Sequence, residues 1–388
     1  MNTEYKKLGQ YIRQVDVRNT DGKEDNLLGV SVQKVFISSI ANTVGTDFTK
    51  YKVVKHGQFT YIPDTSRRGD KIGIALLTDC DEGLVSNVYT VFEVIDTEKL
   101  CPEYLMLWFS RPEFDRYARF KSHGSVREIF DWEEMCNVTL PVPDIEKQRS
   151  IVKAYKAITD RIELKRKLND NLLSQAQTYF SLIFSDKDLE KPLPQGWKVA
   201  KVGDYCVDNV ANISKTDNFE TILYLDTGSI TSNYIDELQE LNLLTDEIPS
   251  RAKRKATHGD IVYSTVRPNL RHYGILQNPP ENLIVSTGFA VLHNKGLEVT
   301  NDFLFMWLTN KSILDYLQAI AENSVSTYPS LSVSDLMNVK IIVPVATILE
   351  KITHFLSSVF AAISENNRQI QMLTRSLDTL LPKLLTDR

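Results

Sequence analysis

An internal repeat limits the fold of this chain more than any other feature of the sequence. Lys55-His-Gly-Gln-Phe-Thr-Tyr61 resembles Thr257-His-Gly-Asp-Ile-Val-Tyr263, and Val85-Ser86 matches Val285-Ser286. Matching residues lie about 200 positions apart, whereas solenoid repeats have periods of roughly 20–50 residues. The repeat therefore predicts two whole domains of related fold.

Further landmarks recur in the same order. Tyr104-Leu-Met-Leu-Trp108 matches Phe303-Leu-Phe-Met-Trp307, and Asn137-Val138 matches Asn338-Val339. The separation is 202 residues at the histidines, 199 at the tryptophans and 201 at the asparagines. Short loop insertions explain this drift, and a chance similarity between two stretches of sequence would not preserve the order.

Each repeat combines strand and helix patterns. Short apolar, β-branched runs at residues 71–77 and 282–285 are bounded by Gly, Pro and Asp, which is typical of strands. Residues 104–120 and 303–320 repeat apolar side chains at helical spacing. The expected fold class is α/β, in the sense of mixed α+β, with two related globular domains.

A long helix with a heptad pattern follows each repeat. Residues 146–183 contain no Gly or Pro, and their apolar positions alternate between steps of four and three; the same register recurs after Pro344. A narrow seam sustained for about four heptads is typical of a coiled coil. The seam residues are Ile151, Ile158, Ile162, Leu172, Ile352, Leu356, Val359, Ile363 and Leu373.

The two helices are expected to pair with each other. Because they belong to repeats related by an internal pseudo-twofold, the simplest arrangement is an intramolecular antiparallel coiled coil. The alternative is that each helix packs on its own domain. Polar residues in the seam, such as Asn169 and Asn366, usually set the register of such helices and are seldom ligands.

Composition bounds the functional class. The chain has 42% hydrophobic residues and lacks a signal-peptide pattern or a long apolar run, so a cytoplasmic protein without a membrane is expected. Its four cysteines show no metal-ligand spacing and are expected to be buried apolar residues. The net charge of −5 argues against nucleic-acid binding, although residues 251–272 hold six cations against one acid.

Short motifs on this frame resemble those of a known family. Leu193-Pro-Gln-Gly-Trp197 with Val202-Gly-Asp-Tyr205, and the shorter Leu8-Gly-Gln-Tyr11, are similar to the start of a target-recognition domain of type I restriction-modification specificity subunits. Pro141-Val-Pro143 followed by Glu146-Lys-Gln148 resembles the start of their spacer helix. The second helix has no glutamine matching Gln148, and the first repeat lacks the Pro-x-Gly-Trp motif.

This resemblance implies a division of the chain and a set of partners. The implied domains are a first target-recognition domain at 1–145, a spacer helix at 146–187, a second target-recognition domain at 188–345 and a second spacer helix at 346–388. Each domain would read one half of a bipartite site in double-stranded DNA. Two modification subunits would supply S-adenosylmethionine chemistry, and restriction subunits would supply cleavage with ATP and magnesium, so this chain would hold no cofactor or metal.

Enzyme motifs in the sequence are incomplete. Asn278-Pro279-Pro280 resembles an adenine methyltransferase motif, but Glu281 replaces the aromatic ring that stacks on the flipped base. Pro143-Asp144 with Glu163 and Lys165 matches a nuclease spacing, but a two-residue step on a helix turns the last two side chains about 200° apart. No phosphate-binding G-x-x-x-x-G-K-[ST] loop is present. The chain is therefore expected to be non-catalytic.

Candidate DNA-contacting residues come from matched loops rich in cations and polar side chains, since such groups contact bases and phosphates. They are Lys34, Arg67, Arg68, Lys71, Ser125 and Arg127 in the first repeat, and Arg251, Lys253, Arg254, Arg267, Asn269, Arg271 and Ser326 in the second. His56, His258, Trp108 and Trp307 are interpreted as residues of the fold. The alternative function is a coiled-coil adaptor that binds proteins without reading DNA.

Overall fold

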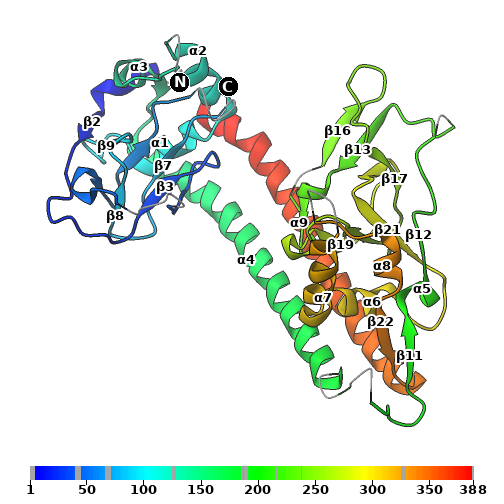
Figure 1. The fold of residues 1–388 in the computed structure, drawn as a ribbon. Helices are drawn as coiled ribbons and strands as arrows, with labels where there is room; N and C mark the ends of the chain where they lie inside the picture. Colours follow the sequence, from blue (N-terminus) through cyan, green and yellow to red (C-terminus); the bar gives the residue numbers. More distant parts are fainter. Residues whose placement is uncertain are drawn as a thin grey trace. The chain divides into compact units, whose positions relative to one another are not determined.

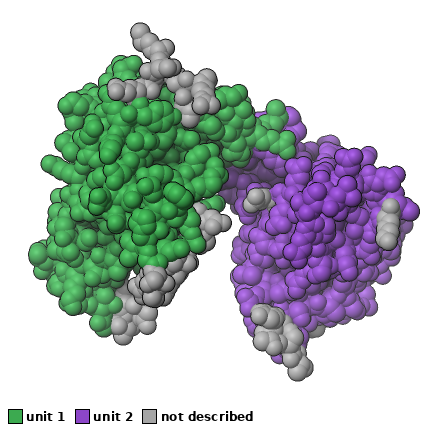
Figure 2. Space-filling model, turned by 90° about the horizontal axis from the view of Figure 1, so that it is seen from above, with its two compact units in different colours: residues 1–162, 372–388 green, residues 163–371 purple. Residues whose placement is uncertain are grey.

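The structure, a computed structural model, describes residues 5–39, 45–65, 71–124, 128–184, 187, 191–214, 216–236, 238–324 and 329–386. The chain divides into two compact units, coloured separately in Figure 2. Unit 1 comprises residues 1–162 and 372–388, and unit 2 comprises residues 163–371. Each sequence repeat therefore lies in a unit of its own, with part of both long helices.

Unit 1 is built on an antiparallel sheet with the strand order β2-β9-β6-β7 (Figure 1). Phe59 on β6 pairs with Phe92 on β9, and the two buried rings stack at 4.8 Å. The four strands are β2 (Ile12–Val15), β9 (Thr90–Val94), β6 (Phe59–Tyr61) and β7 (Ile74–Leu76). The remaining strands pair as β1 (Tyr5–Lys7) with β10 (Thr139–Pro141), β3 (Leu28–Val30) with β4 (Phe36–Ser38), and β5 (Lys52–Lys55) with β8 (Glu82–Val85).

The helices of unit 1 bury their apolar faces in the same core as the sheet. They are α1 (Pro102–Phe109), α2 (Pro112–Lys121) and α3 (Trp132–Asn137). The first two begin with proline, whose fixed φ suits the first helical position. The third begins where the Asp131 side chain accepts a hydrogen bond from the Glu134 N–H at 2.9 Å. Trp108 is buried on α1, as predicted.

Unit 2 repeats this architecture. Its antiparallel sheet has the order β12-β21-β18-β19, which matches the sheet of unit 1 strand for strand. These strands are β12 (Cys206–Asp208), β21 (Phe289–Asn294), β18 (Ile261–Ser264) and β19 (Tyr273–Ile275). The helices α6 (Asn301–Leu308), α7 (Lys311–Glu322) and α8 (Val333–Met337) follow as α1 to α3 do in unit 1. The repeat found in the sequence is thus a repeat of fold.

Unit 2 also has a second four-stranded sheet, in which β13 and β20 are parallel neighbours. Its order is β16 (Gln239–Asn242), β13 (Thr221–Leu225), β20 (Leu283–Ser286) and β17 (Ala252–Lys255). The remaining elements are β11 (Lys198–Lys201) paired with β22 (Lys340–Val343), β14 (Ile230–Thr231) paired with β15 (Tyr234–Ile235), and α5 (Val202–Tyr205). The pair β17·β20 corresponds to β5·β8 of unit 1, since Val85 and Val285 are matched landmarks.

Matched residues make matched contacts in the two units. The Leu8 N–H donates to the Val138 carbonyl at 2.8 Å, and the Val202 N–H donates to the Val339 carbonyl at 3.0 Å. The next residue is glycine in both units: a Cβ on Gly9 would lie 2.8 Å from the Cys136 Cβ, and a Cβ on Gly203 would lie 3.1 Å from the Met337 carbonyl oxygen. The short Leu-Gly and Val-Gly motifs are therefore explained by close packing against the segment before β10 and β22.

Two long helices, α4 (Ile145–Phe184) and α9 (Ala346–Thr386), contain 40 and 41 residues. Within unit 2 they run antiparallel, because Tyr179 contacts Phe355 whereas Asn169 contacts Asn366. Within unit 1, Ile151 near the start of α4 shares a core with Leu385 near the end of α9. The predicted antiparallel pairing is confirmed.

The predicted seam is the inward face of both helices. Ile151, Ile162, Ile352, Leu356, Val359 and Ile363 are buried, and Ile158, Leu172 and Leu373 are half-buried. The buried residues of α9 also belong to the core that contains Phe303 of α6. Pairing between the helices and packing on the domain, which the sequence left as alternatives, therefore both occur in unit 2.

Gln148 accounts for one motif at the start of α4. Its fully buried side chain accepts a hydrogen bond from the Cys101 N–H at 2.8 Å and donates to the carbonyls of Lys99 and Pro143 at 2.9 and 2.8 Å. In the heptad register of α9 the matching residue is Leu349, which is buried in the apolar core. The missing glutamine is thus replaced by apolar packing.

Among the described residues, α9 is also long and apolar enough over Ala346–Leu385 to pass a test for a membrane span based on length and composition. Its apolar side chains have another explanation, because Ile352, Leu356 and Phe360 are almost fully buried in the core of unit 2. Packing inside the protein therefore explains the apolar character of this buried part of the helix.

Candidate nucleic-acid interface

The turn between β18 and β19 contains three of the predicted DNA-contacting residues. We call this segment, residues 265–272, the arginine turn. Arg267, Asn269 and Arg271 are all exposed there, around a short 3₁₀ turn at Pro268–Leu270. Arg267 and Arg271 have φ values of 48° and 58°, in the left-handed region that side chains other than glycine seldom adopt. Such strain persists only where the surrounding structure fixes it, and it is often found at functional sites.

Neighbouring segments hold this turn. The Arg267 N–H donates to the Pro329 carbonyl at 3.0 Å, and the Ser232 N–H donates to the Arg271 carbonyl at 2.8 Å. Ser232 and Asn233 form the turn of the β14–β15 hairpin, both with positive φ. This hairpin was not predicted from the sequence, although polar residues suited to a two-residue turn between strand-forming residues were a signal for it.

The loop between α7 and α8 lies beside this turn. Val266 and Ser330 form an isolated antiparallel bridge, and the Leu331 N–H donates to the Thr265 carbonyl at 2.7 Å. The bridge therefore joins the arginine turn to the end of the loop that contains Ser326. Ser326 itself lies outside the described residues.

The corresponding loops of unit 1 are joined in the same way. Asp64 and Ile129 form the matching bridge, and the Thr65 N–H donates to the Glu128 carbonyl at 3.0 Å. These residues flank the two loops that carry the predicted Arg67, Arg68, Ser125 and Arg127, all of which lie outside the described residues. Lys71, which lies near the end of the β6–β7 loop, is exposed.

The cations in and just before β17 occupy different environments. Arg251 and Lys253 are exposed, whereas Arg254 is half-buried and burial lowers the pKa of its guanidinium. The Thr287 N–H donates to the Arg251 carbonyl at 2.9 Å, and the Thr265 N–H donates to the adjacent Gly288 carbonyl at 3.0 Å. These bonds connect the residue before β17 to the arginine turn, so Arg251 is the cation of this segment best placed to extend the surface.

Lys34 is a correction to the predicted set. Its side chain is buried, and its Nζ forms an ion pair with Asp115 Oδ1 at 2.9 Å while donating to the Phe109 carbonyl. Burial is the main cause that lowers the pKa of this ammonium group, and the bond to Asp115 opposes it. An ammonium enclosed in this way cannot reach a phosphate, so Lys34 fastens the segment before β4 to helix α2. A basic residue in a loop gave no sequence signal of this partner.

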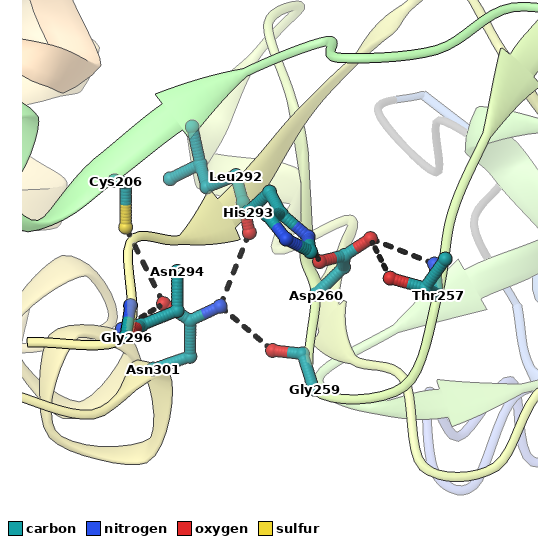
Figure 3. Close-up of polar contacts among 9 residues, drawn as sticks. All are labelled: Cys206, Thr257, Gly259, Asp260, Leu292, His293, Asn294, Gly296 and Asn301. Atoms are coloured by element: carbon teal, nitrogen blue, oxygen red, sulfur yellow. Dashed lines mark hydrogen bonds and ion pairs between the residues drawn. The ribbon is translucent and has the colours of Figure 1, made fainter.

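The glycines of the repeated His-Gly landmark lie in matching turns of the fold. Gly57 and Gly259 both have φ of 81°, which favours glycine. Figure 3 shows how the turn before β18 is fixed: the Gly259 carbonyl accepts from Asn301 Nδ2 at 2.7 Å. The buried Asp260 carboxylate accepts from the Thr257 N–H at 2.7 Å and contacts His293 Nδ1 at 2.8 Å. These polar residues serve the turn and its junction with β21.

Residues of the incomplete enzyme motifs have other partners. Lys165 Nζ donates to Asn366 Oδ1 on α9 at 3.2 Å, and Glu163 pairs with Lys167 one helical turn later. Asp144 Oδ1 accepts from the Lys147 N–H at 2.9 Å at the start of α4. The three charged residues of the nuclease-like pattern therefore belong to a helix start and a helix surface.

The cysteines are free thiols in the structure. Cys101 and Cys206 are buried, as predicted, whereas Cys80 and Cys136 are half-buried. Burial raises the pKa of the Cys206 thiol to about 12, which disfavours the reactive thiolate.

Comparisons with known proteins agree with this architecture. A family model described as the type I restriction modification DNA specificity domain matches residues 7–174 and 194–375. The chain is 26% identical over 317 residues to the type I restriction enzyme MjaIX specificity subunit of Methanocaldococcus jannaschii, covering 75% of this chain and 70% of that protein. It is also 26% identical over 194 residues to the type I restriction enzyme HindI specificity subunit of Haemophilus influenzae, covering 49% of this chain and 41% of that protein.

A solved structure shares the fold. The crystal structure of the type I restriction-modification system S subunit from M. genitalium has a TM-score of 0.56 to this chain at 14% identity, covering 99% of this chain and 96% of that one. The family model matches both repeats and most of the chain. The chain therefore belongs to the family of type I restriction-modification DNA specificity proteins.

Proposed function

We propose that this chain is the DNA-specificity subunit of a type I restriction-modification complex. Unit 1 reads one half of a bipartite site in double-stranded DNA, and unit 2 reads the other half. The chain itself is non-catalytic. Modification subunits carry S-adenosylmethionine and transfer the methyl group, and restriction subunits use ATP and magnesium to cleave.

The observation that carries this proposal is the repeated pair of loops. In unit 1 the β6–β7 loop is joined by an isolated backbone bridge to the loop between α2 and α3. In unit 2 the β18–β19 loop is joined in the same way to the loop between α7 and α8. The bridges are Asp64 with Ile129 and Val266 with Ser330. Two domains that present the same pair of loops are suited to reading two sites of the same kind.

The side chains of the loop pair in unit 2 are chemically suited to binding DNA. Arginine presents a planar fork of donors that binds the O6 and N7 atoms of guanine, and it also contacts phosphates. Arg267 and Arg271 lie at the two ends of one fixed turn, with the exposed Asn269 between them. A local surface of this kind allows an acidic chain to bind DNA, since groups within about 10 Å dominate the electrostatic interaction at ordinary salt.

A methylation map tests the proposal. The full chain is produced together with a partner methyltransferase subunit, in a host that lacks its own DNA methylation, and methylated bases are located across the host genome. We expect one bipartite motif with two specified parts and a fixed gap. The purified chain alone should not transfer methyl groups. Methylation by the isolated chain, or a motif that stays the same when this chain is omitted, would refute the proposal.

A further inference from the structure

Helix α7 contacts the arginine turn of unit 2 through one polar side chain. The Asn269 N–H, at the centre of the turn, donates to Gln318 Oε1 at 3.0 Å. The amide end of Gln318 is held in turn, because its Nε2 donates to Glu322 Oε1 at 2.8 Å on the same helix. The side-chain amide of Gln318 is thus held by Glu322 through its nitrogen and supports the turn through its oxygen.

Further anchors of the turn include bonds between backbone groups. Pro329 accepts from the Arg267 N–H, and Ser232 donates to the Arg271 carbonyl. They hold the two ends of the turn, whereas Gln318 holds its centre. Because both arginines have left-handed backbone conformations, the turn depends on such contacts to keep its shape.

The same helix position is used in unit 1. Arg119 on α2 lies 199 residues before Gln318, the separation also found between Trp108 and Trp307. Its Nη1 donates to the Thr65 carbonyl at 3.3 Å, and its Nη2 pairs with Glu128 Oε2 at 3.3 Å. In both units, therefore, a polar side chain at an equivalent helix position contacts the loop of the main sheet. Arg119 on α2 contacts the β6–β7 loop, and Gln318 on α7 contacts the β18–β19 loop.

We propose that Gln318 is a positioning residue for DNA readout by unit 2, which keeps Arg267 and Arg271 in the geometry needed to discriminate bases. This inference rests on the proposed function. Gln318 acts through the backbone of Asn269, so its loss disorders the turn and leaves the charge of the surface unchanged. The expected effect is a loss of base discrimination in one half-site, with little change in the salt-dependent attraction to DNA.

Three variants of the full chain, each paired with the methyltransferase subunit, test this. Gln318→Leu removes the acceptor. Gln318→Glu keeps an acceptor for the Asn269 N–H, but its carboxylate is repelled by the carboxylate of Glu322. The double variant Gln318→Glu with Glu322→Gln exchanges the two groups, so that the acceptor for Asn269, the bond between positions 318 and 322 and the net charge are all restored.

The readout is the rate of methylation on the bipartite site of the unaltered chain and on duplexes with a single base changed in either half. One net hydrogen bond is worth a factor of about 2–12, so Gln318→Leu should lower discrimination in one half by about 3- to 10-fold. Discrimination in the other half should be unchanged, and the double variant should restore the lost part. The slope of affinity against salt should remain that of the unaltered chain.

The outcomes separate this inference from the proposed function. If the unaltered chain directs no bipartite methylation, the proposed function fails. If the unaltered chain does so and Gln318→Leu discriminates normally, or loses discrimination equally in both halves, the positioning role is wrong. Failure of the double variant to restore discrimination, although its thermal unfolding matches that of the unaltered chain, would also overturn it.

Discussion

Asn366 Nδ2 on α9 donates a hydrogen bond to Asn169 Oδ1 on α4 at 2.8 Å, within a seam that is otherwise largely apolar. Two further bonds complete the cluster: Lys165 Nζ donates to Asn366 Oδ1 at 3.2 Å, and Asn169 Nδ2 donates to Asn367 Oδ1 at 2.8 Å. A polar pair in a coiled-coil seam fixes the register because any slip leaves its donors and acceptors unpaired. The register of α4 on α9 is therefore set at this level.

The first prediction concerns this asparagine pair. Asn366→Leu leaves Asn169 Oδ1 without its donor and Lys165 Nζ without its acceptor, so the chain should lose about 1–3 kcal/mol of stability. Asn169→Leu together with Asn366→Leu replaces both groups by apolar side chains and should recover most of the loss. The midpoint of urea unfolding measures both effects. A double variant less stable than either single variant would contradict a direct pairing.

The buried pair of Lys34 and Asp115 gives the second prediction. Removing one partner leaves an uncompensated buried charge, so Lys34→Ala or Asp115→Ala should destabilise unit 1 by about 3–5 kcal/mol. Lys71→Ala is the control, because Lys71 is an exposed lysine of the same unit. Limited proteolysis and thermal unfolding report the change. Equal stability of the Lys34 and Lys71 variants would show that the ion pair is unimportant.

The third prediction is a pH dependence at Asp302 in unit 2. Burial raises the pKa of this carboxyl group above 3.8, while the Ser357 hydroxyl donates to its Oδ2 at 2.8 Å. Between the unfolded pKa and the raised folded pKa, the folded state binds more protons, so the stability contributed by this group falls as pH rises. Asp302→Asn should therefore be more stable than the parent at neutral pH, with the difference vanishing below about pH 3.8. Unfolding midpoints from pH 3.5 to 7 test this, and a constant difference would refute it.

The sequence predicted the fold better than it predicted the site. The repeat, the seam and the core tryptophans follow from periodic apolar patterns, which the physics of burial translates directly into structure. Lys34 was mistaken for a DNA contact because its partner, Asp115, lies 81 residues away and nothing local marks the pair. The roles of Gln318 and the β14–β15 hairpin depend on tertiary hydrogen bonds, for which a single sequence offers only weak turn signals.

The fourth prediction tests whether unit 2 reads only one half of the bipartite DNA site. Arg271→Asn tolerates the left-handed conformation of this position and removes the guanidinium. A lost bidentate contact to a base costs about 1–3 kcal/mol, so recognition of one half-site should weaken while the other half stays intact. Arg368→Asn, at an exposed arginine of α9 in the same unit, removes the same charge and should leave both halves unchanged. Competition binding with half-site mismatches measures the effect. A uniform loss across all sequences, with a salt slope reduced by about one, would instead identify Arg271 as a phosphate contact.

The last prediction is that α4 and α9 set the gap between the two half-sites. The structure decides where such a test must be made: Ala176 and Phe180 are fully buried in the core of unit 2, so an insertion beside them would disrupt that core. The better sites are the boundaries between the units, after Ile162 in α4 and after Gln371 in α9. Seven residues added at both sites, copied from an adjacent heptad, keep the apolar seam in register.

Such an insertion lengthens each helix by about 10 Å at 1.5 Å per residue, which corresponds to about three base pairs at 3.4 Å each. The methylation map should therefore show a gap about three base pairs longer, with the same bases specified in both halves, because no loop has changed. Ile162→Pro, which breaks α4 at a buried seam position, should abolish recognition of the bipartite site. An unchanged gap in the heptad variant, or altered bases within either half, would show that something other than the helices sets the spacing.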